Sequence, residues 1–334
     1  MALPTRALSI SDGSLYIQKG MKLVLIDALD GKTITSWRLP YTGLQHLNRW
    51  SIRLNRLGVQ SFVPLTKDKV VLLENHKIYK LDLATGEVNA VFEDFQGTRP
   101  LFLSQSDNGN LYFGEYFNNP SRGHVNIFAS EDEGLTFKSV YTFPKDSIRH
   151  VHGVFFDRYS GDLWVTTGDD NSESHIWRTS DEFRTVESVV GGEQQYRAVQ
   201  LLFTKEHIYF GSDTPLEQNN ISRLNRKTGQ VEKLQQVQGT VFYGCKVGDT
   251  LFFSTVVEPG SINKDKRVYL WGSRDGEEWH SILSYQKDML PLKLFQYGQI
   301  RFPSGINKTG NLWFTPFSTS EDQTIKCIQA ESLF

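Results

Sequence analysis

One short phrase recurs along the whole chain and constrains its fold more than any other feature. It consists of a Gly, Asp or Asn turn followed by at least three aliphatic or aromatic residues. Seven copies begin at Leu15 (LYI), Val70 (VVLL), Leu111 (LYF), Leu163 (LWV), Ile208 (IYF), Leu251 (LFF) and Leu312 (LWF). Successive copies start 41 to 61 residues apart, which is a spacing typical of β-propellers with one blade per repeat.

The residues around each copy predict the strands of a blade. In the fifth repeat, apolar runs of strand length are separated by tight turns such as Lys227-Thr228-Gly229. We therefore predict an all-β, seven-bladed β-propeller of four-stranded antiparallel blades, in one domain over residues 1–334. The expected blades span residues 7–40, 59–95, 99–143, 149–190, 196–237, 239–286 and 298–334. Because the last repeat ends after its third strand, residues 2–6 are expected to complete that blade and remove its exposed edge.

Charge and hydropathy exclude several classes of partner. The 36 Lys and Arg residues nearly balance the 38 Asp and Glu residues, so no global field would attract nucleic acid or an anionic membrane. No apolar run approaches the ~18 residues of a membrane span, and the N-terminal sequence lacks the apolar stretch of a signal peptide. These patterns predict a cytoplasmic protein.

Three stretches carry a turn motif. Residues 130–137 read Ser-Glu-Asp-Glu-Gly-Leu-Thr-Phe, and residues 273–279 and 179–185 are a shortened and a degraded version of the same pattern. The motif resembles the Asp-box (BNR repeat) of sialidase-like β-propellers. It closes a hairpin, because the Asp carboxylate accepts backbone N–H groups and Gly permits a positive φ. The resemblance implies a glycan-active propeller and turns between the third and fourth strands, on the face opposite the active site.

Candidate binding residues lie where the chain leads into a blade's first strand and where it leaves the second strand. Alternation of strand direction places both kinds of loop on one rim, where propellers commonly bind ligands. Planar guanidinium groups from four blades would suit a carboxylate, sulfate or phosphate. The predicted substrate-binding residues are Arg99, Arg149, Arg197, Arg301, Glu115 and Tyr116. The alternative is a structural belt in which these arginines pair with neighbouring carboxylates.

The candidate catalytic residues lie on the same rim and are His150, His152, Tyr196, Asp169 and Asp213. Two histidines at i and i+2 of a strand face the same side, so they could transfer protons. Joined by Asp169, they could instead hold a divalent metal ion. A third interpretation is a pair of structural histidines that hydrogen-bond to a rim carboxylate.

The functional prediction is a propeller that binds and cleaves an acidic saccharide, as a glycosidase or a polysaccharide lyase. Two alternatives stay open: a non-catalytic binding scaffold, and a metal-dependent enzyme similar to a lactonase or a sugar dehydrogenase. The sequence contains no nucleotide-binding glycine loop and no Gly-x-Ser-x-Gly elbow. No cofactor is therefore expected, apart from the metal ion of the alternative. The expected partner is an acidic saccharide or another small anionic ligand.

Overall fold

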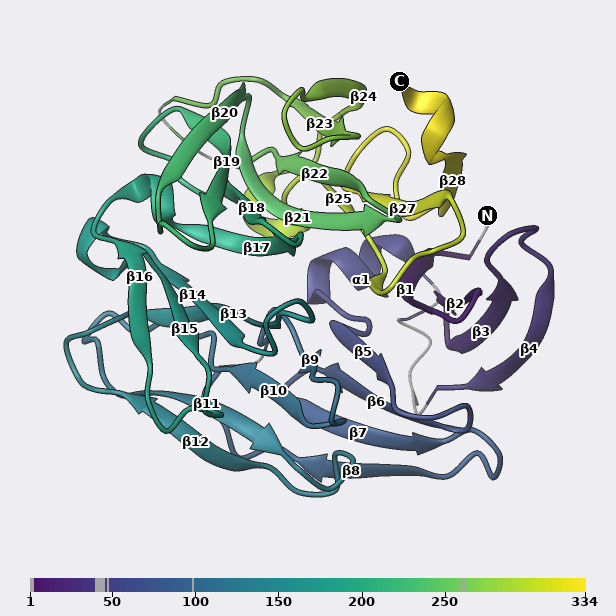
Figure 1. The fold of residues 1–334 in the computed structure, drawn as a ribbon. Coiled ribbons are helices and arrows are strands. Elements are labelled where there is room, and N and C mark those ends of the chain that lie inside the picture. Colours follow the sequence, from purple (N-terminus) through teal and green to yellow (C-terminus); the bar gives the residue numbers. More distant parts are fainter. Residues whose placement is uncertain (1–2, 40–45, 47, 98, 259, 261) are drawn as a thin grey trace. The chain divides into compact units, whose positions relative to one another are not determined.

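The computed structural model of the chain describes residues 3–39, 46, 48–97, 99–258, 260 and 262–334. The chain is a seven-bladed β-propeller of four-stranded antiparallel blades, which confirms the predicted fold class (Figure 1). It divides into two compact units, residues 60–233 and residues 1–59 with 234–334. Each unit is described by itself below.

Residues 60–233 hold four sheets in chain order. The first contains β5 (Ser61–Pro64), β6 (Lys69–Glu74), β7 (Lys77–Asp82) and β8 (Val88–Phe92). The second contains β9 (Ser104–Gln105), β10 (Leu111–Gly114), β11 (Val125–Ser130) and β12 (Lys138–Phe143). The third contains β13 (His150–Phe156), β14 (Leu163–Gly168), β15 (His175–Thr179) and β16 (Glu187–Gly191). The fourth contains β17 (Ala198–Phe203), β18 (His207–Ser212), β19 (Asn219–Asn225) and β20 (Val231–Val237), and the unit ends within β20.

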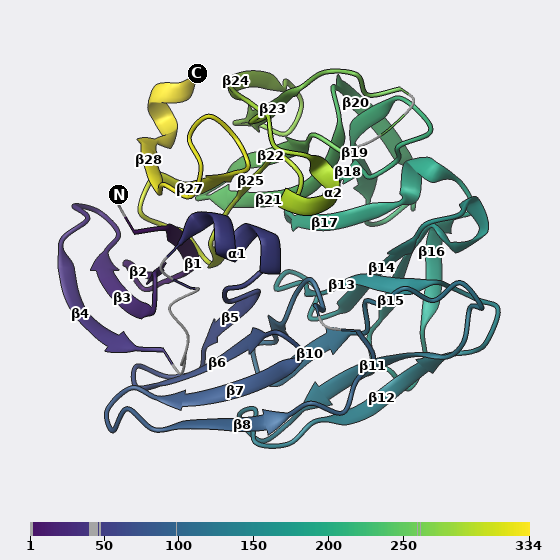
Figure 2. The same ribbon diagram turned by 180° about the vertical axis from the view of Figure 1, so that it is seen from behind.

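The other unit combines the two ends of the chain. Its strands are β1 (Thr5–Ser11), β2 (Ser14–Lys19), β3 (Lys22–Asp27), β4 (Thr33–Arg38), β21 (Thr240–Val247), β22 (Thr250–Val256), β23 (Arg267–Ser273), β24 (His280–Gln286), β25 (Gln299–Arg301), β26 (Ser304–Gly305), β27 (Asn311–Phe317) and β28 (Lys326–Gln329). The unit also holds two helices, α1 (Arg49–Asn55) and α2 (Leu292–Phe295), which are labelled in Figure 2. They meet through the rings of Trp50 and Phe295, whose centroids are 6.3 Å apart. None of the described helices is long and apolar enough to cross a membrane.

The seventh sheet differs from the prediction. It contains β25, β27 and β28 among the described residues, and Thr5 and Arg6 do not form its fourth strand. They begin β1, where they pair with β2 in the first sheet. Ala2, also part of the predicted strand, lies outside the described residues. The two ends of the repeat array meet through a parallel pairing of β1 with β26 and through the Thr5 N–H, which donates to the Gln323 carbonyl at 3.0 Å.

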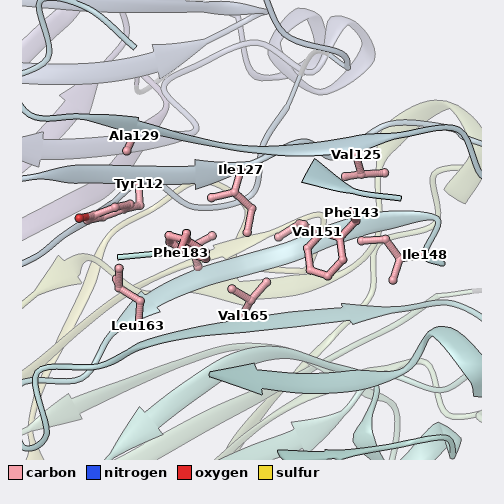
Figure 3. Packing of buried hydrophobic residues seen from close by; sticks show 11 residues of the cluster. Tyr112, Val125, Ile127, Ala129, Phe143, Ile148, Val151, Leu163, Val165 and Phe183 are labelled. Atoms are coloured by element: carbon pink, nitrogen blue, oxygen red, sulfur yellow. The ribbon is translucent and has the colours of Figure 1, made fainter. Parts of the chain in front are cut away.

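The repeated phrase lies on the second strand of every sheet, and packing explains why that strand is apolar on both faces. All six residues of β14 are buried, because its two faces pack against neighbouring sheets. Figure 3 shows this packing for the sheets of β10 and β14 in unit 60–233. The buried cluster comprises Tyr112, Val125, Ile127, Ala129, Phe143, Ile148, Val151, Val154, Leu163, Val165 and Phe183. Such interlocked apolar layers fix the loops at the strand ends.

The three motif turns lie between the third and fourth strands of their sheets. In the first, the Asp132 carboxylate accepts the backbone N–H groups of Leu135 and Thr136 and the Thr136 hydroxyl. Burial opposes ionisation, but these hydrogen bonds lower the pKa of Asp132 to about 2. Gly134 has φ +75°, and in the degraded turn Phe183 takes the equivalent position at φ +73° while filling the core. The turn therefore keeps its shape without glycine.

Candidate functional site

Four loops of unit 60–233 bring charged side chains together at one end of two adjacent sheets. Arg149 precedes β13, Asp169 follows β14, Arg197 precedes β17, and Asp213 follows β18. Asp169 accepts from both arginines: Oδ2 is 2.9 Å from Arg149 Nη1, and Oδ1 is 2.9 Å from Arg197 Nη2. Arg197 Nε also donates to Asp213 Oδ2 at 3.2 Å. Two guanidinium charges are thus offset by two carboxylates.

A pair of histidines lies against Asp169. The Nε2 atoms of His150 and His152 are 3.2 Å apart, and they lie 3.7 Å and 4.0 Å from Asp169 Oδ1. Each Nδ1 faces a backbone carbonyl, that of Phe117 at 3.0 Å for His150 and that of Ala198 at 2.9 Å for His152. A carbonyl only accepts, so each Nδ1 carries the proton in the neutral ring. Both Nε2 electron pairs therefore point toward one small region.

The local backbone explains how the two rings meet. The register of β13 against β14 shifts between Val151 and Gly153, so His152 is the extra residue of a β-bulge. Its ring approaches Gly168 at the end of β14, where an added Cβ would lie 2.8 Å from His152 Cε1 and 2.8 Å from Arg197 Cγ. Glycine at this position therefore allows both side chains to approach the β14 backbone.

Burial sets the proton affinities in this cluster. His150 is 6% exposed and His152 is 2% exposed. Burial lowers the pKa of both imidazoles, and the positive charge of Arg197 further disfavours protonation of each ring. Burial acts the other way on Asp169, but the positive charges of Arg197 and Arg149 outweigh it and hold the pKa of the carboxyl below its ordinary value. At neutral pH the cluster therefore holds neutral histidines beside an ionised aspartate.

The structure brings seven of the predicted residues together: His150, His152, Asp169, Asp213, Arg149, Arg197 and Tyr116. The ring of Tyr116 packs on His150 with 4.2 Å between centroids. Tyr196 precedes Arg197 in a short 3-10 helix and packs against the core cluster of the β17 sheet. Arg99 precedes β9 in the same unit.

Two predicted residues have other surroundings. Glu115 is 1% exposed, and its two oxygens accept the backbone N–H groups of Gln96 and Asn126. Burial raises the pKa of this carboxyl, and its bonds tie two loops together. Arg301 belongs to the other unit, where its guanidinium lies over the rings of Tyr243 at 5.5 Å and Phe317 at 4.8 Å.

Sequence reasoning missed the groups that hold the cluster in place. The buried Gln194 amide donates to the Asp169 carbonyl at 2.8 Å, and the Asn118 side chain accepts from Arg149 Nη2 at 2.7 Å. The carbonyls of Phe117 and Ala198 orient the histidines. Backbone carbonyls leave no mark in a sequence, whereas Gln194 lies only three residues before Arg197 and could have been included with it.

Comparison with known proteins supports the fold. No family model and no curated protein sequence matches the chain. Among solved structures, an oligogalacturonate lyase from Vibrio parahaemolyticus is similar with TM-score 0.62 and 9% identity, covering 97% of this chain and 90% of that one. Regucalcin, a calcium-binding protein from Agrobacterium tumefaciens, gives TM-score 0.50 and 14% identity over 79% and 84% of the two chains. The chain spans only 26% of the tricorn protease and 50% of a prolyl endopeptidase that it also resembles. At these identities the likeness concerns the fold alone.

Proposed function

We propose that this protein is an enzyme that cleaves an acidic saccharide at the cluster around Asp169. The observation that carries the proposal is the pair of neutral imidazoles whose Nε2 atoms face each other at 3.2 Å, beside a carboxylate bound by two arginines from two blades. Perturbed titratable groups gathered at converging loops are characteristic of active sites. The oligogalacturonate lyase, which the chain matches over nearly its whole length, is named for an acidic saccharide.

The chemistry of such a cleavage matches the groups present. Elimination or hydrolysis of a uronate needs a positive group near the substrate carboxylate and a group that takes or gives a proton. Arg149 is the more exposed of the two guanidiniums, with 30% of its side chain accessible, so it is the group that can meet a substrate carboxylate. In the metal-free protein, the imidazole electron pairs beside Asp169 supply the basic side of the cluster.

Turnover of uronate, sialate and sulfated oligosaccharides tests the proposal. New reducing ends would report hydrolysis, and an unsaturated product would report elimination. We expect Arg149→Met to lower kcat/KM on the accepted substrate at least about tenfold, equivalent to roughly 1.4 kcal/mol of transition-state stabilisation. The matched control is Arg178→Met, since Arg178 is a partly exposed β15 residue that pairs with Glu187 away from the cluster. The rate of this variant should stay unchanged.

The outcomes separate the functional classes. Saccharide binding without turnover would identify a binding scaffold and overturn the enzyme proposal. Neither binding nor turnover with any of these acidic saccharides would overturn the substrate class as well.

A further inference from the structure

We propose that His150, His152 and Asp169 bind a divalent transition-metal ion. This inference goes beyond the proposed function, because binding of an ion by the protein does not depend on any saccharide. The three residues come from β13 and the loop after β14, and their donor atoms all lie within 4.8 Å of one another.

The distances between the donor atoms have the dimensions of a metal site. The two Nε2 atoms and Asp169 Oδ1 form a triangle with sides of 3.2, 3.7 and 4.0 Å. The point equidistant from the corners of such a triangle lies about 2.1 Å from each corner. Zinc binds imidazole nitrogen at roughly 2.0–2.1 Å and carboxylate oxygen at roughly 2.0–2.2 Å. One cation at that point would meet all three donors at normal bond lengths.

The orientation of the rings is also that of metal ligands. The Phe117 and Ala198 carbonyls fix the Nδ1 proton and leave each Nε2 as a bare electron pair, 3.2 Å from the other. Two electron pairs at that distance repel each other unless a positive centre lies between them. Metal-binding histidines commonly donate their second ring N–H to a carbonyl or a carboxylate in this way. Buried imidazoles that were merely structural would need a donor on each Nε2.

The carboxylate can take part without leaving its arginines. Asp169 Oδ1 accepts one hydrogen bond from Arg197 Nη2 at 2.9 Å, and a carboxylate oxygen has a second electron pair. Asp169 and Asp213 already offset Arg149 and Arg197, so a bound divalent ion would leave an excess of positive charge. That excess would attract an anionic ligand. We infer that the ion strengthens binding of a carboxylate-bearing molecule at this cluster.

The donor set indicates the class of ion. Two imidazole nitrogens with one carboxylate suit zinc, manganese, iron, cobalt or nickel, whereas magnesium and calcium prefer an all-oxygen shell. Cobalt(II) is therefore a useful probe, because its visible spectrum reports coordination by nitrogen ligands.

The test is titration of the full chain, freed of metal by a chelator, with cobalt(II) and zinc(II). We expect one ion per chain, a visible cobalt spectrum and a higher Tm with either ion. His152→Ala should weaken cobalt binding at least about 100-fold, since even loss of an outer hydrogen bond costs about 10- to 100-fold. Asp169→Asn, a change at a partly exposed side chain, should weaken it at least tenfold and serves if His152→Ala does not fold.

His207→Ala is the matched control, because His207 lies on β18 of the same unit against Tyr209 and outside the cluster. Its cobalt affinity should equal that of the unmodified protein. The proposal is overturned if the unmodified chain binds less than about 0.2 ion, or if His207→Ala impairs binding as much as His152→Ala. Metal binding without saccharide turnover would remove the proposed function and keep the metal site. Turnover that persists in chelator, in a chain that takes up no cobalt, would remove the metal site and keep the proposed function.

Discussion

Two arginine–aspartate clusters, one in each unit, contain the same residue types but have different roles. In unit 60–233, Arg197 binds Asp169 and Asp213 beside the histidine pair. In the other unit, Arg53 of α1 binds Asp288 at 2.6 Å and Asp322 at 3.5 Å. Arg53 is 1% exposed, and its Nε and Nη2 donate to the Phe295 carbonyl at 3.2 and 3.0 Å.

The clusters differ in whether each hydrogen-bond acceptor has a donor. Around Arg53, the second oxygen of Asp322 accepts the Ser318 N–H, and the second oxygen of Asp288 accepts the Leu290 N–H and the Lys287 ammonium. Donors and acceptors are matched, so this cluster joins α1 to the segments around Phe295 and Asp322. Around Asp169, two imidazole electron pairs face each other. A matched cluster is a structural joint, and a surplus of electron pairs at one point indicates a binding site.

The largest expected effect is loss of the Arg53 joint. Arg53→Met would leave Asp322 without its buried cation and Asp288 with Lys287 alone. We expect the free energy of unfolding to fall by about 3–5 kcal/mol. Arg197→Met should cost less, about 1–2 kcal/mol, because the Arg197 side chain is 16% exposed and Asp169 keeps Arg149. Denaturant titration of both variants measures the difference. An Arg197→Met variant as unstable as Arg53→Met would show that the Asp169 cluster is a structural joint too.

The fold could be predicted from the sequence because the repeat expresses one physical requirement. A strand packed on both faces must be apolar throughout, so VVLL, LYF and LWV mark the second strand of their sheets. The pairing of the chain ends could not be predicted this way. The sequence of Thr5 and Arg6 is compatible with a strand in the first sheet or in the seventh. Which sheet they join depends on the relative stability of the two pairings, and they pair with β2.

The candidate site was predicted in part, and the reason differs for each residue. Alternating strand direction placed Arg149 and Asp169 at the same sheet end, where they pair. Side-chain alternation along a strand suggested that His150 and His152 share a face, but no pattern indicated the bulge at His152. Glu115 was read as a rim acid, whereas burial made it a partner of backbone N–H groups.

Gly168→Ala tests whether the Asp169 cluster depends on close packing. The added methyl group would lie 2.8 Å from both His152 Cε1 and Arg197 Cγ, so one of these side chains must move. We expect a loss of about 1–3 kcal/mol in the free energy of unfolding, the usual cost of overpacking. Cobalt affinity should also fall at least tenfold, because the two Nε2 atoms would no longer converge. Cobalt titration with a melting curve measures both effects, and unchanged affinity would mean that the rings need no such confinement.

The smallest expected effect is the part of the pH dependence of stability that the Asp169 cluster contributes in metal-free protein. Burial lowers the pKa of His150 and His152 in the folded state, so below the ordinary value of 6.5 the unfolded chain binds more protons. The free energy of unfolding should therefore fall as the pH drops below 6.5, by up to about 1.4 kcal/mol per pH unit for each histidine. The lowered pKa of Asp288 makes its stabilisation disappear only below 3.8. Denaturant titrations between pH 7 and pH 5 should show a reduced slope in His152→Leu and an unchanged slope in Arg178→Met, whose side chain lies outside the cluster. An unaltered slope in His152→Leu would place the titrating group elsewhere.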